Sequence, residues 1–143
     1  MREVLEKIQA QAAVMQAFME AKPTDDPTIL VERLAQANAY LALSGKLLAD
    51  AKHLQNDQMT RLWNAKGDAF AKLGTTLAQK LLVAYCKDES YLVDWLDRIN
   101  RGLVHSSDNL RTLISFAKEN MRMSRYAGEV TNDEFQYENE SEW

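Results

Sequence analysis

Residues 92–117 read LVDWLDRINRGLVHSSDNLRTLISFA, with apolar side chains at intervals of three, four and seven. Such spacing places these side chains on one face of an amphipathic helix. Asp88 or Ser90 can cap the start of the helix. We expect the helix to end near Arg125, after a basic last turn and before Gly128. The apolar face consists of Leu92, Leu96, Ile99, Leu103, Leu110, Leu113 and Ala117.

Two segments earlier in the chain show the same rhythm and predict helices over residues 2–21 and 27–66. Both prolines lie between them, and Asp26 followed by Pro27 is typical of a helix N-cap and first helical position. In the second helix leucine alternates with alanine or serine, which lets a neighbouring helix approach closely. The two faces are Leu5, Ile8, Ala12, Met15 and Met19, and then Leu30, Leu34, Ala37, Leu41, Ser44, Leu48 and Ala51.

A shorter helical segment follows two glycines, Gly67 and Gly74. Thr75 can cap a helix that runs to Cys86 or Lys87. Glycine inside a helix costs only ~1 kcal/mol, so both a kinked continuous helix and a reversal of the chain are open.

Together these segments predict an all-α fold. Leucine and alanine occur 18 times each, against 11 for valine and isoleucine combined, a bias toward helix formers. We expect an elongated antiparallel bundle of about four helices, two of them long and coiled-coil-like, over residues 1–125, with a tail over 126–143. The predicted core is Leu5, Ile8, Met15, Leu34, Leu41, Leu48, Leu62, Leu77, Leu81, Leu96, Ile99, Leu103, Leu110 and Leu113.

The sequence indicates a soluble protein of the cytoplasm. Cys86 is the only cysteine and cannot form an internal disulfide, and the N-terminus does not resemble a secretory signal. Charged residues interrupt every apolar run well before the roughly 20 residues that cross a bilayer. We therefore expect no membrane partner.

The C-terminal tail is the least ordinary feature. Residues 126–143 carry six acids and no base, whereas the preceding residues carry 17 bases and 15 acids. Acids spaced along a chain can imitate a phosphate backbone, and aromatic side chains supply compact anchors. The tail can fold back over the basic end of the last helix, or dock on a partner or a second copy. The expected partner-binding residues are Tyr126, Glu134, Phe135, Tyr137, Glu138, Glu140, Glu142 and Trp143.

The two histidines are the natural candidates for a metal site or for catalysis. His53 lies near Asp50 and Asp57, and His105 precedes Asp108. Metal centres in bundles use several glutamates and paired Glu-x-x-His motifs, which this sequence lacks. Glycine-rich phosphate loops and nucleophile elbows are also missing. We assign no metal, cofactor or catalytic residue.

An enzymatic alternative rests on Arg98 and His105. Their spacing resembles the Arg-x(4–6)-His motif of the all-helical HEPN-type ribonucleases. That resemblance implies that His105 is the acid–base residue and that Arg98 stabilises the phosphate. The residue after the arginine, usually polar in that family, is Ile99 here.

A further alternative is a nucleic-acid-binding accessory of replication or recombination. Basic side chains along the second and third helices would contact phosphates in this case. Their positions scatter around the helix axis, so direct binding of nucleic acid is not the leading expectation. These residues are Lys46, Lys52, Arg61, Lys66, Lys72 and Lys80.

Two stretches, residues 48–52 (LADAK) and 103–119 (LVHSSDNLRTLISFAKE), resemble short helical proteins of bacteriophages and prophages. The resemblance implies the cytoplasm of a bacterial host and a role in binding, such as inhibition of a host defence nuclease. We accordingly predict a non-enzymatic interaction module that binds a host or phage protein, including one that handles nucleic acid. Self-association is also open.

Overall fold

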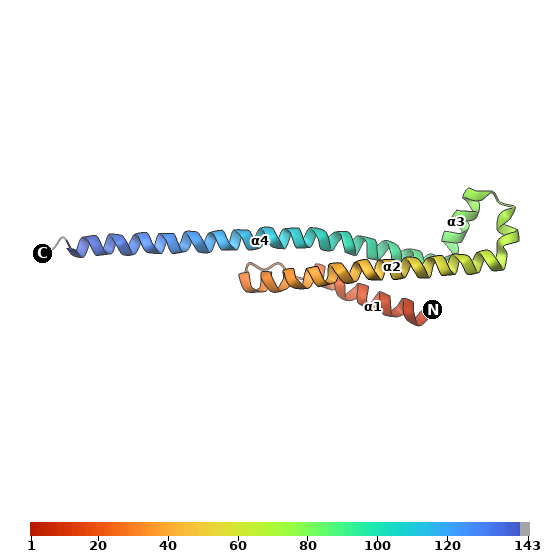
Figure 1. Cartoon of the computed structure of the whole chain (residues 1–143), viewed down its shortest axis with the longest axis horizontal. Helices are drawn as coiled ribbons and strands as arrows, with labels where there is room; N and C mark the ends of the chain where they lie inside the picture. Colours follow the sequence, from red (N-terminus) through yellow and green to blue (C-terminus); the bar gives the residue numbers. More distant parts are fainter. Residues whose placement is uncertain (141–143) are drawn as a thin grey trace.

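The chain is almost wholly helical in the computed structural model, which describes the backbone of residues 1–140 and the side chains of residues 1–129. The helices are α1 (Arg2–Met19), α2 (Pro27–Ala71), α3 (Thr75–Tyr85) and α4 (Lys87–Glu140). Figure 1 shows α2 running antiparallel to both α1 and α4, which pack against it. The prediction of an elongated all-α bundle with two long helices is confirmed.

The start of α2 forms as its sequence predicts. Asp26 has an extended backbone, and its Oδ1 accepts a hydrogen bond from the Thr28 amide at 2.9 Å. Pro27 occupies the first helical position, where a missing N–H costs nothing. Arg33 Nη1 donates to the Lys22 carbonyl at 2.7 Å and ties the α1–α2 loop to the first turns of α2.

The segment with two glycines contains both a kink and a reversal. α2 bends at Lys66, whose φ of −130° and ψ of 15° are not helical, and then continues to Ala71. The chain turns back at Gly74, whose φ of 70° and ψ of 153° suit glycine alone. Gly74 is therefore the N-cap of α3. The prediction that Thr75 caps this helix is wrong, because Thr75 is its first helical residue.

Helix α4 is longer at both ends than its sequence predicts. It begins at Lys87, so Asp88 and Ser90 lie in its first turn and do not cap it. At the other end the helix does not stop near Arg125 but continues through Gly128 to Glu140. Gly128 does not adopt a positive φ, and a helical glycine costs only ~1 kcal/mol, which is too little to end a helix by itself.

The core lies between α1, α2 and α4. Along α2 the small residues Ala37, Ser44 and Ala51 are buried. The leucines that precede each of them on the same face are only half-buried: Leu34, Leu41 and Leu48. Small side chains mark the line where two helices approach most closely, which explains this order. At Gly102 of α4 an added Cβ would lie 2.9 Å from Met19 Sδ, so this glycine makes room for the end of α1. The central cluster is Ile8, Ala12, Met15, Leu47, Ala51, Leu92, Leu96, Ile99 and Leu103.

Two residues of the predicted core are exposed. Leu77 is 49% exposed, because the short helix α3 buries Ala78 and leaves the adjacent side chain outside. Leu113 is 43% exposed, because it lies beside the α1–α2 loop, where the bundle ends. Helical periodicity predicts which face is apolar but not how far along that face a partner helix extends.

Candidate interaction surface

The C-terminal part of α4 extends beyond the rest of the bundle (Figure 1). All of residues 118–129 are exposed, and the helical backbone continues to Glu140. We refer to residues 118–140 as the overhang, which is about 35 Å long from the helical rise per residue. The nearest other segment is the corner at Asp25 and Pro27, which shares an open groove of ≈ 420 Å³ with Ala117, Asn120, Met121, Ser124 and Arg125.

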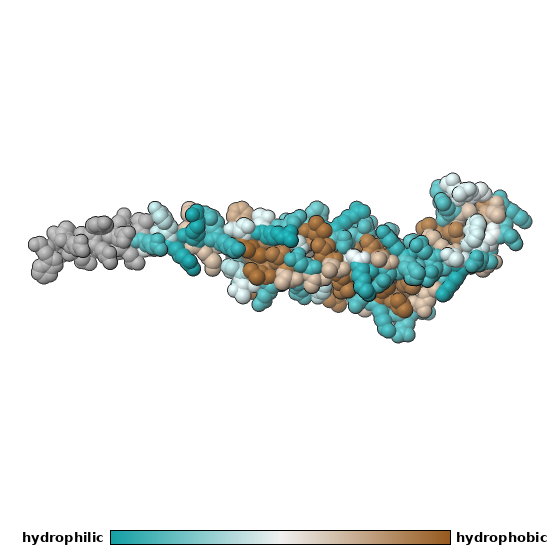
Figure 2. All heavy atoms as spheres, in the orientation of Figure 1, coloured by the Kyte–Doolittle hydropathy of each residue, from teal (hydrophilic) through white to brown (hydrophobic). Residues whose placement is uncertain are grey.

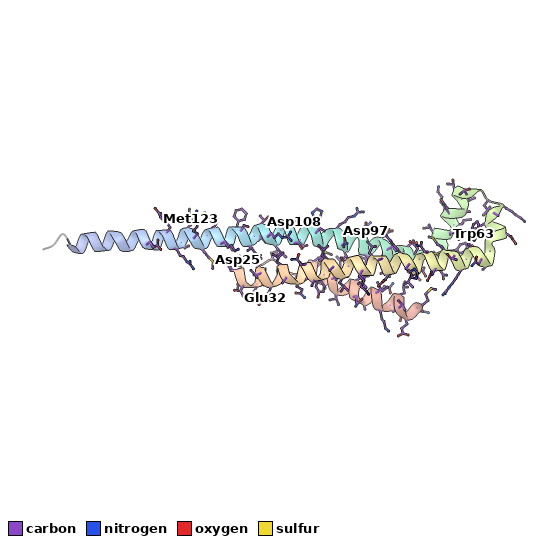
Figure 3. The ribbon with its side chains drawn as sticks, in the orientation of Figure 1. Asp25, Glu32, Trp63, Asp97, Asp108 and Met123 are labelled. Carbon is purple, nitrogen blue, oxygen red and sulfur yellow. The ribbon has the colours of Figure 1, made fainter. Side chains whose placement is uncertain are left out.

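Large apolar side chains line the start of the overhang and the turn before it. Phe116, Met121, Met123 and Tyr126 are each more than half exposed. In Figure 3, Met123 lies on α4 beyond the corner marked by Asp25. Figure 2 shows hydrophilic side chains mixed with paler, more apolar ones along this part of the helix. The helix thus combines anchoring side chains with charge on a surface that is mostly exposed and that only the corner at Asp25 and Pro27 borders.

Charge changes sign within this stretch of α4. Residues 111–125 carry four bases and one acid, and residues 126–143 carry six acids and no base. Arg111 pairs with Asp108 at 3.1 Å, and Arg122 pairs with Glu119 at 2.8 Å. Lys118 and Arg125 form no ion pair with any residue in the described part of the chain. The basic half therefore keeps charge available for a partner.

The partner-binding residues expected from the sequence fall along and after the overhang. Tyr126 is 68% exposed on α4. Glu134, Phe135, Tyr137, Glu138 and Glu140 belong to the helical backbone, but their side chains lie outside the described ones. Glu142 and Trp143 lie outside the described residues altogether. Because the backbone of α4 continues away from the bundle, residues 126–140 do not fold back over the basic end of the helix (Figure 1).

Arg98 and His105 both lie on α4, where the structure leaves their side chains exposed. They are seven positions apart, which is about 10 Å along the helix axis. The nearby carboxylate Asp108 pairs with Arg111 at 3.1 Å. Within the described part of this single chain, neither residue lines any of the grooves between the helices. The ribonuclease interpretation stays a prediction, and no contact in the structure favours it.

The two carboxylates near His53 have different ion-pair partners. Its Nε2 lies 3.5 Å from Asp57 Oδ2, whereas Asp50 Oδ2 pairs with Lys46 Nζ at 3.3 Å. All these side chains lie on one face of α2 in contact with solvent. Among the residues whose side chains are described, no group of three or more His, Cys, Asp or Glu is placed to hold a metal ion.

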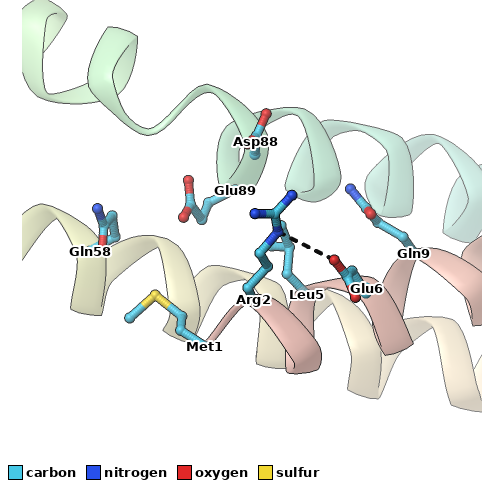
Figure 4. Close-up of a pocket in the computed structure, with 8 residues that line it drawn as sticks. All are labelled: Met1, Arg2, Leu5, Glu6, Gln9, Gln58, Asp88 and Glu89. Carbon is cyan, nitrogen blue, oxygen red and sulfur yellow. Dashed lines mark ion pairs between the residues drawn. The ribbon is translucent and has the colours of Figure 1, made fainter.

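Sequence reasoning missed a groove at the opposite end of the bundle, where the starts of α1 and α4 meet α2. Figure 4 shows Arg2 between the carboxylates of Glu6, Asp88 and Glu89, with Arg2 Nε 3.4 Å from Glu6 Oε1. The groove of ≈ 590 Å³ is open, and Arg2 already supplies the charge that its carboxylates attract. No sequence motif marks it, because its residues come from three separate helices.

The hairpin formed by the end of α2 and by α3 carries an aromatic cluster. Phe70 is buried, with Trp63 stacked 6.2 Å away and Tyr85 edge-on at 6.3 Å between ring centroids. Lys66 Nζ lies 4.9 Å from the centre of the Tyr85 ring, within cation–π range. Residues 61–87 carry five bases and one acid. The hairpin is thus a basic, aromatic end of the molecule, remote from the acidic end (Figure 1).

Within the described residues, no helix combines the length and the apolar character that crossing a bilayer requires. Comparisons with known proteins bear on neither family nor fold: no protein-family model, curated protein or solved structure matches the chain.

Proposed function

We propose that this chain is a non-enzymatic protein-interaction module, associated with a bacteriophage or prophage. It binds a host or phage protein through the overhang of α4 and the acidic tail. The target has a basic surface, as a host defence protein or another protein that handles nucleic acid would. The fold alone does not select this function, since helical bundles serve many.

The observation that carries the proposal is the exposure of large apolar side chains on the C-terminal part of α4. Met121, Met123 and Tyr126 lie on the overhang, and each is more than half exposed. Tyrosine, methionine and arginine are the residues that protein interfaces favour. Exposure of these side chains to water is unfavourable, and a partner that buries them lowers the free energy.

The charge of the tail defines the class of target. Its six acids lie on and beyond the overhang, with no base among them. Such a segment attracts a basic surface and repels an acidic one, and this speeds association and selects partners. A nucleic-acid-binding protein has such a surface at the site where it binds phosphates.

The test is capture of a target from a lysate of the bacterial host, followed by titration of the purified pair. The chain truncated after Arg125 is expected to lose capture while α1, α2 and α3 keep their helicity by circular dichroism. Heparin, a polyanion, is expected to displace the full-length chain from its target. Undiminished capture by the truncated chain would show that the tail is not the binding element.

A point variant separates the interaction from the loss of a whole segment. Tyr126→Ser removes an anchor that is 68% exposed, and Tyr91→Ser removes a tyrosine that is 63% exposed on the same helix within the bundle. Truncating an interface anchor typically weakens binding by about 1–2 kcal/mol, or roughly tenfold. We expect that loss for Tyr126→Ser and not for Tyr91→Ser.

The hairpin supports a second candidate function, binding of single-stranded nucleic acid. Trp63 and Tyr85 are exposed in the segment 61–87, which also carries five basic residues. The nucleobases of a single strand stack on such aromatic rings. Fluorescence anisotropy of a labelled oligonucleotide would show binding that weakens steeply with salt. The double variant Lys72→Glu, Lys80→Glu would abolish it, whereas Lys7→Glu on α1 would not. Binding that is indifferent to salt would exclude a mode driven by phosphates.

A further inference from the structure

We infer that the C-terminal segment of α4 pairs with the same segment of a second copy, antiparallel, in a two-helix coiled coil. The pairing segment comprises residues 111–140. The inference rests on the proposed function only in taking this part of α4 as the interaction surface. It adds a specific partner and a specific geometry.

The first step concerns the overhang itself. Isolated helices in water are marginally stable, because most helical stability in proteins comes from packing of an apolar face. Residues 118–129 are all exposed in the single chain, and Gly128 weakens the helix further. A second helix beside the overhang would provide the missing packing.

The second step concerns the order of charges along the helix. Basic and acidic residues follow one another at spacings of three, four and seven, so that they share one side of α4. The basic members come first and the acidic members last. Two parallel copies would place like charges together, whereas two antiparallel copies place each basic half beside an acidic half. The series is Arg111, Lys118, Arg122, Arg125, Glu129, Asp133 and Glu140.

The third step fixes the register. When the two helices cross between Arg125 and Tyr126, three of the four basic residues each meet an acid of the second copy, and Arg125 meets Tyr126. Arg122 then lies opposite Glu129, since 122 and 129 are equally far from the crossing point. By the same symmetry Lys118 lies opposite Asp133, and Arg111 lies opposite Glu140. Every pair occurs twice, as a closed two-fold dimer requires.

An apolar seam lies beside this charged stripe. Phe116, Met123 and Tyr126 are spaced by seven and three residues, so they lie along one side of the helix, and all are exposed. Val130 and Tyr137 continue the same spacing in the sequence. In the antiparallel register Met123 lies opposite Gly128 of the second copy, two residues along the chain from that copy's Tyr126. The exposed pair of Arg122 with Glu119 is a weak local contact, which Arg122 can exchange for Glu129 of the second copy.

The experiment measures the mass of the full-length chain in solution by sedimentation equilibrium, using charge-reversed variants. The first variant carries Arg111→Glu, Lys118→Glu and Arg122→Glu; the second carries Glu129→Lys, Asp133→Lys and Glu140→Lys. We expect the natural chain to be a dimer and each variant alone to have a Kd at least tenfold weaker. An equimolar mixture of the two variants is expected to restore a one-to-one dimer, because the glutamates introduced at 111, 118 and 122 then face the lysines introduced at 140, 133 and 129.

A matched control reverses three bases at the other end of the molecule: Lys66→Glu, Lys72→Glu and Lys80→Glu. This variant is expected to dimerise like the natural chain. If it fails to associate, or if the natural chain grows into open-ended assemblies, the tail of one copy binds the hairpin of the next and the inference is overturned. A natural chain that stays monomeric, or variants that do not restore each other, also overturn it. Circular dichroism confirms that each variant keeps its bundle.

The result is distinguishable from that of the proposed function. A monomeric chain that still captures a basic target through residues 126–143 would overturn the dimer and leave the proposed function intact. A dimer that captures no other protein would support the inference and remove the proposed target.

Discussion

Asn100 Nδ2 on α4 donates a hydrogen bond to the Oγ of the fully buried Ser44 on α2, at a distance of 2.8 Å. The same hydroxyl donates to the Leu41 carbonyl at 2.8 Å, so it is satisfied both as donor and as acceptor. This bond crosses the seam where small residues bring the two helices closest. It therefore fixes their register as well as their distance, since a shift by one turn would leave Ser44 without its donor.

Removing this hydrogen bond is expected to weaken the bundle moderately. Asn100→Ala deletes the donor, and the free energy of unfolding should fall by about 1 kcal/mol, the net value of one hydrogen bond. Urea denaturation followed by circular dichroism measures the change. Asn56→Ala, at an exposed position of α2, is the control and should leave the midpoint unchanged. Equal effects of both variants would contradict the role given to Asn100.

Leu96 of α4 should contribute far more to stability than Leu77 of α3. Leu96 is fully buried in the central cluster, so Leu96→Ala leaves a cavity and should lower the free energy of unfolding by about 2–5 kcal/mol. Leu77 is 49% exposed, and Leu77→Ala should cost under about 1 kcal/mol. Chemical denaturation tests both. A large loss for Leu77→Ala would mean that α3 packs more tightly than the structure shows.

Alanine should have opposite effects at two glycines. Gly74 has a φ of 70°, so Gly74→Ala forces a side chain into a strained conformation and should destabilise the hairpin by about 1–3 kcal/mol. Gly128 lies in a helix, and beyond its own turn of backbone no atom of the described residues lies within 4 Å of an added Cβ. Gly128→Ala should therefore strengthen the overhang by ~1 kcal/mol. Amide hydrogen exchange of each segment distinguishes the two outcomes, because the overhang can open without unfolding the bundle.

The single thiol should make stability fall in alkaline solution. Burial raises the pKa of Cys86 above its ordinary value, and the negative charge of Glu89 adds to this effect. The folded chain therefore keeps a proton that the unfolded chain releases, so the free energy of unfolding decreases as pH rises past the ordinary thiol pKa. Urea titrations at about pH 7 and about pH 10 should show a larger decrease for the natural chain than for Cys86→Ala. Equal decreases would mean that other groups account for the whole effect.

The sequence predicted the helices of the bundle well, because their apolar residues recur at helical spacing and their breaks carry strong local signals. Asp26 and Pro27 marked the start of α2, and the five core residues Ile8, Met15, Leu96, Ile99 and Leu103 are buried as expected. It failed at α4, where Gly128 suggested an end that the helix does not have. A glycine is a weak stop signal, and only the continuing backbone decides its outcome.

The candidate surface was only partly predictable. The acids and aromatics of residues 126–143 stood out by composition, but nothing in their spacing showed that they would prolong α4 instead of folding back. Phe116 and Met123 were not singled out, because an apolar residue at helical spacing is usually core. Their exposure depends on where α2 begins beside α4, and this depends on the packing of all three helices.

The sequence by itself determined that the chain is helical, where most of its helices begin, and that its charge is divided between a nearly neutral body and an acidic end. These properties are local, since spacing, capping and composition act within a few turns. Only the tertiary structure decided that the small residues of α2 are the ones buried against the other helices and that Leu77 and Leu113 remain exposed. It also decided that α4 extends beyond the helices beside it. Burial requires a second surface, and whether one is present depends on the relative lengths and register of separate helices.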